Sequence, residues 1–483
     1  MMPDTGIARF LPGGADGPDA CTLSSALAGK ELRAERLMEI TLDRIASVNS
    51  RVNAIVSLRP AEELLAEAAS SDDQDPVGPL HGLPVAIKDL ADARGLPTSQ
   101  GSPVFAEEIA EADSPHVARL RAAGAIVIGK TNTPEFGLGS NTYNPVHGAT
   151  ANPYDTSRTC GGSSGGAAVA LACGMVAIAD GSDMMGSLRN PAGWNNVYGM
   201  RPTWGRVPGN ATGDLFLHRL STNGPMARSP ADLALQLNVM SGVHPLASVA
   251  SSEPVPIPPP ESKAGGTRIG WLGDWGGAWP FERGILALCE NALGVFADLG
   301  AAVDPVPPPF ARDDLWQSWI QLRSWSIASE LHPLLTDPSL SNQLKPEAIW
   351  EIEQARALSA LDIHRASEIR SDWWRRALTL FETYDALALP TAQCWPFSID
   401  LHWPKTLLGK EMDTYHRWME VTTPASLLGL PVVAIPAGFG EAGLPMGVQL
   451  IGPPDSDGAL LTLAQAYHEA TRWPQRAPPG LTP

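Results

Sequence analysis

The segment TCGGSSGGAAVALACGMVAIADGSDMMGSLRNP, residues 159–191, joins two clusters of glycine and serine by an apolar run. The run predicts a helix from Ser164, a stop at Gly174 and a buried strand over 175–179, because glycine ends helices and short apolar runs fill covered sheets. Residues 116–132 repeat the scheme, with a stop at Gly124. A helix that leads directly into a buried strand is typical of α/β proteins.

The same alternation extends outward along the chain. Apolar stretches at 84–89 (PVAIKD), 429–439 and 446–452 predict further strands, and residues 457–471 predict a helix. Near the N-terminus, apolar residues three and four positions apart define one helical face: Ala34, Met38, Leu42, Ile45, Val48 and Val52. We therefore expect an α/β fold with a largely covered sheet.

One change of composition along the chain bears on the domain organisation. Residues 251–266, SSEPVPIPPPESKAGG, are proline-rich and predict an extended, exposed connection. We interpret it as a surface loop within a single domain spanning 1–483, with a linker between two domains as the alternative. In this interpretation 24–75 form an N-terminal helical region, 80–210 the catalytic core, and 267–483 the remaining sheet and the helices that line the pocket.

Tryptophans concentrate after the proline-rich segment. Two interpretations remain open: they pack in the core, or they line a pocket for an apolar substrate. The residues concerned are Trp316, Trp319, Trp325, Trp350, Trp373, Trp374, Trp395, Trp403 and Trp418.

Bulk composition excludes several classes of function. The formal net charge of −18 opposes binding to nucleic-acid phosphates. The N-terminal sequence shows no apolar signal-peptide core, and the longest apolar run, residues 167–179, is too short to cross a membrane. The five cysteines include no C-x-x-C pair, which favours free thiols in a cytoplasmic protein and no metal site.

The GGSSGG cluster at 161–166 admits three interpretations. A phosphate-binding loop would need a Gly-Lys-Ser/Thr ending or a G-x-G-x-x-G pattern, and neither is present. Residues 161–165 match G-x-S-x-G, but that nucleophile elbow follows an apolar strand, and turn-forming residues precede it here. The third is a relay in which a buried, neutral Lys88 deprotonates Ser163, which in turn deprotonates Ser187.

These motifs together resemble the amidase signature family. The resemblance rests on GGSSGG, on GSDMMGSLR (181–189), on LHGLPVAIKD (80–89), and on five further blocks: GKTNTPEFG (129–137), GATANPYD (148–155), NGPMARSPADLAL (223–235), YDALALPT (384–391) and PVVAIPAGFGEAGLPMGVQLIG (431–452). It covers nearly the whole chain. It implies a large mixed β-sheet covered on both faces by α-helices, and hydrolysis of amides through a Ser–cisSer–Lys triad.

The resemblance also assigns roles to residues. Ser187 resembles the nucleophile, Ser163 the bridging serine after a cis peptide bond, and Lys88 the base. The backbone N–H groups of Met184, Met185, Gly186 and Ser187 correspond to the oxyanion hole. The supporting residues are Asp183, Arg189, Ser164 and Gly162, and the candidate substrate-pocket residues are Phe136, Leu138, Tyr143 and Trp194.

The chain departs from the family's usual motif at one place. Met184, Met185 and a single glycine, Gly186, follow Asp183, where the family usually has a small residue or Thr/Ile and then two glycines. Gly186 still permits a sharp turn before Ser187. We expect the oxyanion hole to persist, because backbone donors do not depend on the side chain.

The implied enzyme is an amidase that needs no metal or organic cofactor. The tryptophans and methionines favour a hydrophobic small-molecule amide, anilide or carbamate, as for an aryl-acylamidase or a urethanase. We expect a monomer or homodimer that binds neither nucleic acid nor membrane. The alternatives are a catalytically inactive scaffold of the same fold and a glutamine-hydrolysing amidotransferase subunit.

Overall fold

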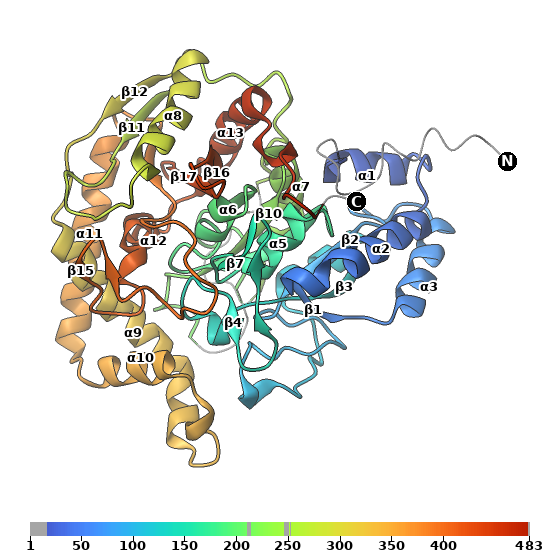
Figure 1. Ribbon diagram of the computed structural model, residues 1–483, viewed down its shortest axis with the longest axis horizontal. Coiled ribbons are helices and arrows are strands. Elements are labelled where there is room, and N and C mark those ends of the chain that lie inside the picture. Colours follow the sequence, from blue (N-terminus) through green and yellow to red (C-terminus); the bar gives the residue numbers. More distant parts are fainter. Residues whose placement is uncertain (1–16, 210–213, 246–250, 252, 482–483) are drawn as a thin grey trace.

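The computed structural model describes residues 17–209, 214–245, 251 and 253–481 (Figure 1). Its α-helices in chain order are α1 Ala20–Ala28, α2 Ala34–Val52, α3 Ala61–Asp72, α4 Pro115–Ala122, α5 Gly165–Ala172, α6 Asn190–Trp194, α7 Pro230–Met240, α8 Ile285–Asp298, α9 Arg312–Thr336, α10 Pro346–Arg356, α11 Ala360–Phe381, α12 Thr423–Leu428 and α13 Asp457–Thr471.

One mixed sheet organises the fold. Its strands, in spatial order, are β1 Ile55–Leu58, β3 Ile126–Thr131, β2 Pro84–Lys88, β8 Ile178–Asp183, β10 Thr222–Ala227, β9 Tyr198–Arg201, β16 Val432–Phe439, β17 Pro445–Ile451, β13 Ala386–Pro390, β11 Arg268–Trp271 and β12 Ala302–Pro305. Three short pairs lie outside it: β4 Tyr143–Asn144 with β5 Gly148–Ala149, β6 Ala151–Asn152 with β7 Asp155–Thr159, and β14 Thr406–Leu407 with β15 Lys410–Glu411.

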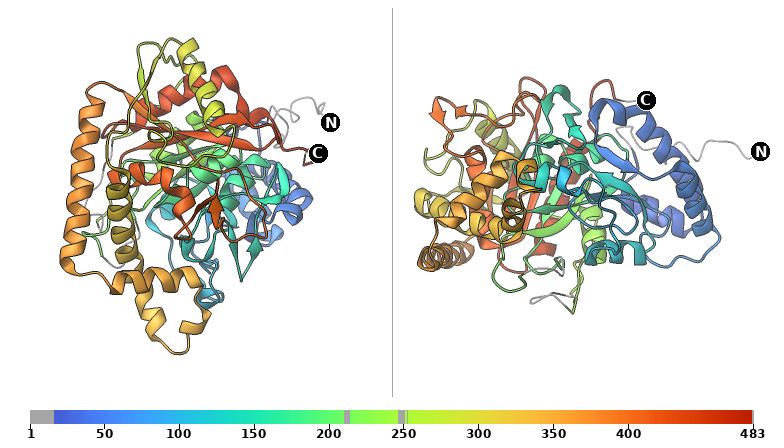
Figure 2. Two further views of the ribbon diagram at one scale, coloured as in Figure 1. Left: turned by 60° about the vertical axis from the view of Figure 1, so that its left-hand side comes forward. Right: turned by 90° about the horizontal axis from the view of Figure 1, so that it is seen from below.

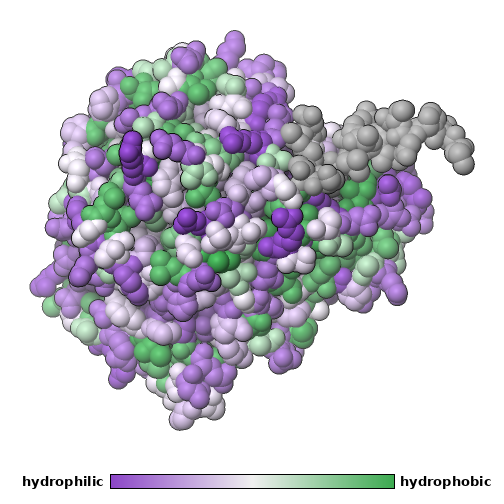
Figure 3. Space-filling view, in the orientation of Figure 1, coloured by the Kyte–Doolittle hydropathy of each residue, from purple (hydrophilic) through white to green (hydrophobic). Residues whose placement is uncertain are grey.

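Helices cover both faces of this sheet, as the sequence predicts. Every residue of β2, β3, β13 and β17 is buried, which requires a cover on each side of the sheet. In the rotated view, helices lie above and below the central strands (Figure 2). The α/β fold class and the mixed sheet are therefore confirmed. At the molecular surface, hydrophilic and hydrophobic residues are interspersed on the face shown in Figure 3.

Most predicted elements lie where the sequence places them. The helix predicted at 457–471 is α13, the strands predicted from 84, 429 and 446 are β2, β16 and β17, and the predicted N-terminal apolar face belongs to α2, where five of its six residues are buried and Leu42 is half-buried. The N-terminal region also contributes the edge strand β1, which pairs antiparallel with β3.

The strand predicted over 175–179 begins three residues later. Gly174 adopts φ +66°, and residues 175–177 carry the chain from the end of α5 to the sheet, so β8 spans Ile178–Asp183. The Gly-Ser pair at 181–182 therefore lies within this strand. A Cβ atom on Gly181 would lie 2.6 Å from both Leu188 Cδ2 and Ser164 Oγ, so glycine there permits a close approach to the serine loop.

The remaining structural expectations concern segments without regular structure. Residues 253–266 of the proline-rich segment contain neither helix nor strand and are mostly exposed. Residues 1–16, where the sequence shows no signal-peptide core, and Ser252 lie outside the described residues. Within the described part of the chain, no helix is both long and apolar enough to cross a bilayer, and all five cysteines have free thiols.

Candidate active site

Lys88 lies at the end of β2, surrounded by hydroxyl groups. Its Nζ atom is 2.8 Å from Ser163 Oγ, 2.9 Å from Ser164 Oγ and 3.1 Å from Ser182 Oγ. The backbone N–H of Lys88 donates to Asp180 Oδ1 at 2.6 Å, which ties the end of β2 to β8. The structure thus brings Lys88 and Ser163 into direct contact, as the predicted relay requires.

The surroundings of Lys88 favour a neutral amine. The side chain is almost completely buried, and burial lowers its pKa from 10.5 to about 7, although the nearby carboxylates of Asp180 and Asp183 oppose the shift. An amine with this pKa is largely deprotonated slightly above neutral pH. It can then accept a proton from a hydroxyl group in contact with it.

The loop that carries Ser163 and Ser164 is held close to the turn of Ser187. The peptide bond between Gly162 and Ser163 is cis. The backbone N–H of Gly162 donates to Asn190 Oδ1 at 3.3 Å, and that of Ser164 donates to the carbonyl oxygen of Ser187 at 3.2 Å. These bonds connect the two glycine-serine clusters that the sequence separates by the apolar run.

A buried ion pair fixes the turn before Ser187. Asp183 accepts hydrogen bonds from Arg189 Nη2 at 2.9 Å and Nε at 3.0 Å, and from the backbone N–H of Leu188 at 3.0 Å. Burial alone would raise the pKa of Asp183, but Arg189 and Arg201 hold it well below its usual range. Arg189 also donates to Gln449 Oε1, Ser426 Oγ and the carbonyl oxygen of Thr422, so both residues act as scaffold.

The carboxylate of Asp183 also removes one group, the N–H of Gly186, from the predicted set of oxyanion-hole donors. The N–H of Gly186 donates to Asp183 Oδ1 at 2.9 Å, so this amide is already engaged. Gly186 adopts φ +85°, and a Cβ atom there would lie 2.7 Å from Thr422 Cγ2, which explains why glycine is required. Among the described residues no partner engages the N–H groups of Met184, Met185 and Ser187, and these three remain candidate donors.

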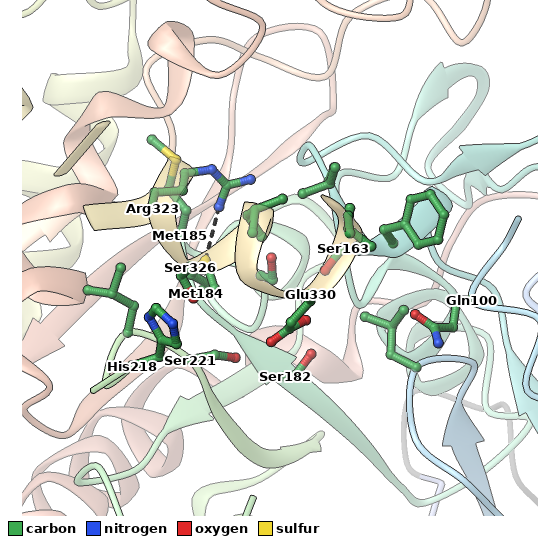
Figure 4. Close-up of a pocket in the computed structure, with 18 of the residues that line it drawn as sticks. Gln100, Ser163, Ser182, Met184, Met185, His218, Ser221, Arg323, Ser326 and Glu330 are labelled. Atoms are coloured by element: carbon green, nitrogen blue, oxygen red, sulfur yellow. Dashed lines mark hydrogen bonds between the residues drawn. The ribbon is translucent and has the colours of Figure 1, made fainter. Parts of the chain in front are cut away.

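A cavity of about 790 Å³ opens beside these groups (Figure 4). Ser163, Ser182 and Ser187 lie in its wall, together with the side chains of Met184 and Met185 and of α9. Ser187 is 7 % exposed, and its hydroxyl makes no hydrogen bond to another group in the described part of the chain. A hydroxyl left free at the wall of a cavity of this size is accessible to a small-molecule carbonyl group.

Both methionines of the turn border this cavity. Met185 is 2 % exposed and packs in the core, whereas Met184 is half-buried, and its Sδ atom accepts a hydrogen bond of 3.2 Å from Arg323 Nη1 (Figure 4). The sulfur side chains therefore shape the pocket and connect the turn to α9. This agrees with the flexible, polarisable character of methionine.

The predicted pocket residues divide into two groups. Phe136 and Leu138 line the cavity, but Tyr143 and Trp194 do not. Tyr143 stacks on His402 with ring centroids 4.5 Å apart, and Trp194 is fully buried and stacks on Trp418 at 5.7 Å. Both rings pack against segments that are distant in the sequence, and neither forms part of the cavity wall.

The tryptophans do not form the wall of this cavity. None of the chain's tryptophans, all of which lie within the described residues, lines it. Trp319, Trp373 and Trp418 are fully buried in the core, and Trp350 and Trp403 line a separate cavity of about 630 Å³. The cavity beside Ser187 is therefore not the tryptophan-lined pocket of the second interpretation.

Sequence analysis missed three residues of the site. Ser182 contacts Lys88, and Arg323 and Glu330 line the cavity from α9. The sequence could have indicated Arg323 and Glu330, because they are an arginine and a glutamate seven positions apart within the tryptophan-rich stretch 315–331. Within the described residues, no group of three histidine, cysteine or carboxylate side chains is placed to hold a metal ion.

Comparison with known proteins gives the family of the chain. The family described as Amidase matches residues 36–461. The chain belongs to the amidase signature family. This is a family of amide hydrolases, and its motifs meet in this structure around Lys88 and Ser163.

Relatives of this amidase agree in fold and family. It is 32 % identical over 470 residues to an acylamidase of Rhodococcus erythropolis, covering 95 % of this chain and 96 % of that one. It is 34 % identical over 486 residues to a glutamyl-tRNA(Gln) amidotransferase subunit of Chloroflexus aggregans, with 94 % and 96 % covered. The crystal structure of a bacterial aryl acylamidase superposes with a TM-score of 0.88 at 26 % identity, covering 96 % of this chain and 98 % of that chain.

Proposed function

We propose that this amidase cleaves linear C–N bonds by acyl transfer to Ser187. Neutral Lys88 removes the proton of Ser163, which removes the proton of Ser187 as its Oγ attacks the substrate carbonyl carbon. The relay then delivers the proton to the leaving nitrogen, and the C–N bond breaks. Water attacks the acyl-enzyme along the same path, which releases the acid and restores the hydroxyl of Ser187.

One observation carries this proposal: a buried amine with a pKa of about 7 lies 2.8 Å from Ser163 in the wall of the cavity that also contains Ser187. No hydrogen bond joins the hydroxyls of Ser163 and Ser187 among the described residues. Catalytic hydrogen bonds are often long without substrate and shorten in the reacting complex. The step from Ser163 to Ser187 requires such a shortening.

The negative charge of the tetrahedral intermediate requires donors that are not otherwise engaged. The N–H groups of Met184, Met185 and Ser187 meet this condition, whereas that of Gly186 does not. Their position on the turn fixed by Asp183 and Arg189 means that they need little reorganisation during the reaction. We assign the oxyanion hole to these three amides.

We propose a small amide or anilide as substrate, with a carbamate as a further candidate. Leu90, Phe105, Phe136 and Leu138 provide apolar surface for an acyl or aryl group, and serine hydroxyls in the same cavity provide polar contacts. The similarity to an acylamidase of Rhodococcus erythropolis supports the amide class, and the similarity to a bacterial aryl acylamidase supports the anilides.

A screen of p-nitroanilides, primary amides and carbamates with the purified protein tests this proposal. We expect turnover of at least one amide or anilide that needs no second polypeptide and is lost after treatment with a fluorophosphonate. Absence of turnover across all three classes, with a folded protein, would contradict it. It would favour the inactive scaffold instead.

The pH profile of kcat/KM is expected to follow Lys88. Below a pH of about 7 the amine is protonated and cannot accept a proton, so activity should rise with pH through that value and reach a plateau above it. The measurement is kcat/KM between pH values of about 5 and 9.5 for an uncharged anilide. A flat profile across this range, or an acid limb near the ordinary pKa of a carboxyl group, would exclude Lys88 as the base.

The amidotransferase alternative has support from the similarity of 34 % to the amidotransferase subunit of Chloroflexus aggregans. It predicts glutaminase activity that depends on partner chains. Glutamine hydrolysis together with copurifying partner chains would favour it, and hydrolysis of anilides by the isolated chain favours the independent amidase.

A further inference from the structure

One face of α9 forms a continuous wall of the cavity. Residues three and four positions apart on a helix share a face. Six of the seven cavity-lining residues of α9 follow this spacing, namely Arg323, Ser326, Ile327, Glu330, Leu331 and Leu334, and Ser329 is the seventh. Two of them are ionisable, and neither belongs to the family motifs described above.

The charge of Arg323 is already compensated. Its Nε atom donates to Glu351 Oε1 at 2.7 Å, its Nη2 atom donates to the hydroxyl of Tyr415 at 2.7 Å, and its Nη1 atom donates to Met184 Sδ. The guanidinium and the Glu351 carboxylate are almost completely buried, so they form a closed ion pair. Arg323 is therefore not a counter-ion for other groups in the cavity.

Glu330 has no such partner. Among the described residues, no ion pair or hydrogen bond engages its carboxylate, which extends from α9 into the cavity on the side of Ser163 and Ser182 (Figure 4). Desolvation raises the pKa of Glu330, and no cation counteracts this effect. Glu330 as a whole residue is exposed and lines the cavity, so a ligand in the cavity can reach it.

The other ionisable groups of the wall do not supply a cation. Burial lowers the pKa of His218, and it lowers that of His416 well below its ordinary value, so both rings are neutral. Asp214 adds a second carboxylate, whose Oδ2 atom accepts the N–H groups of Leu217 and His218 at 2.7 and 3.0 Å. Once Lys88 is neutral, the cavity carries a net negative charge next to its catalytic hydroxyls.

We propose that Glu330 binds an ammonium group of the substrate, so that the preferred amides of this enzyme carry a free amine besides the scissile bond. The proposal rests on the acyl-transfer function above and specifies its substrate class. A cation placed against Glu330 would contact a carboxylate that no other cation among the described residues engages. The electrostatic potential of the cavity would also attract it. An uncharged amide would fill the apolar wall but leave this carboxylate without a partner.

Paired substrates test the proposal at a pH of about 8.5, where Lys88 and the histidines are neutral and an alkylamine is protonated. In one series of p-nitroanilides the acyl chain ends in an ammonium group (4-aminobutanoyl, 5-aminopentanoyl) or in the methyl group of equal size (pentanoyl, hexanoyl). A second series carries the same change on the leaving amine. In at least one series, we expect kcat/KM of the wild-type enzyme to favour the ammonium member by about ten-fold.

Three variants separate the contribution of charge from that of structure. Glu330→Gln should reduce this preference to near unity by lowering kcat/KM of the ammonium members, and Glu330→Lys should reverse it. Glu368→Gln is the matched control, because Glu368 is an exposed glutamate of α11, with 63 % of its side chain accessible. It should leave the preference unchanged.

The outcomes distinguish the two proposals. Hydrolysis of the uncharged members without any preference for the ammonium members would overturn the role of Glu330 and leave the amidase mechanism intact. A preference that survives in Glu330→Gln would likewise overturn it. Failure to hydrolyse any member, charged or uncharged, would contradict the acyl-transfer function itself.

Discussion

Replacing Ser187 by alanine is expected to lower kcat/KM by about 10⁴- to 10⁶-fold. The variant loses the atom that forms the acyl-enzyme, and water positioned by the oxyanion donors supports only the residual rate. The cavity, Lys88 and Ser163 remain in place, so KM should change little. The measurement is single-substrate kinetics on the best anilide, with an enzyme concentration high enough to follow slow turnover.

The fold of the Ser187→Ala variant should remain intact. The hydroxyl makes no hydrogen bond among the described residues, so its removal leaves no buried polar group without a partner. The midpoint of thermal unfolding should match that of the wild-type protein. Activity within about ten-fold of wild type in this variant would refute the assignment of the nucleophile.

Replacing Arg189 by methionine is expected to lower the free energy of unfolding by about 3–5 kcal/mol. The change leaves Asp183 buried without its main ion-pair partner, and Gln449, Ser426 and the carbonyl oxygen of Thr422 each lose a donor. Arg201 Nη1, 3.4 Å from Asp183 Oδ1, provides partial compensation. Chemical denaturation followed by tryptophan fluorescence measures the effect.

An exposed ion pair supplies the control for this experiment. Arg375 pairs with Asp372 on α11, where 68 % and 57 % of the two side chains are accessible. The Arg375→Met variant should lose less than about 1 kcal/mol. Equal losses in the two variants would show that Asp183 and Arg189 do not fix the turn.

The sequence was sufficient for the fold, and it also singled out three residues that the structure places at one candidate site. Alternating helices and apolar strands predicted the α/β class, because a covered sheet demands apolar strands and amphipathic helices. The motifs pointed to Lys88, Ser163 and Ser187. In the structure, Ser163 and Ser187 both lie in the wall of one cavity, and Lys88 contacts Ser163. These features depend on local patterns, which a single sequence contains.

Features that depend on how a group is oriented in the folded protein were harder to predict from the sequence. Gly186 was predicted as an oxyanion donor, but only the folded turn shows that its N–H is directed at Asp183. Trp194 and Tyr143 were predicted to line the pocket, but stacking on Trp418 and His402, which lie far away along the chain, determines their orientation. Glu330 was missed for the same reason, since α9 lies next to the site only in the folded protein.

Mass spectrometry after reaction with a fluorophosphonate tests the central claim most directly. The account predicts one adduct per chain, located on Ser187 by peptide sequencing, which forms faster above a pH of about 7 and is absent from the Ser187→Ala variant. The Lys88→Met variant should react far more slowly, because its serine lacks the base. An adduct on a residue other than Ser187, or no adduct on a folded protein, would contradict the account.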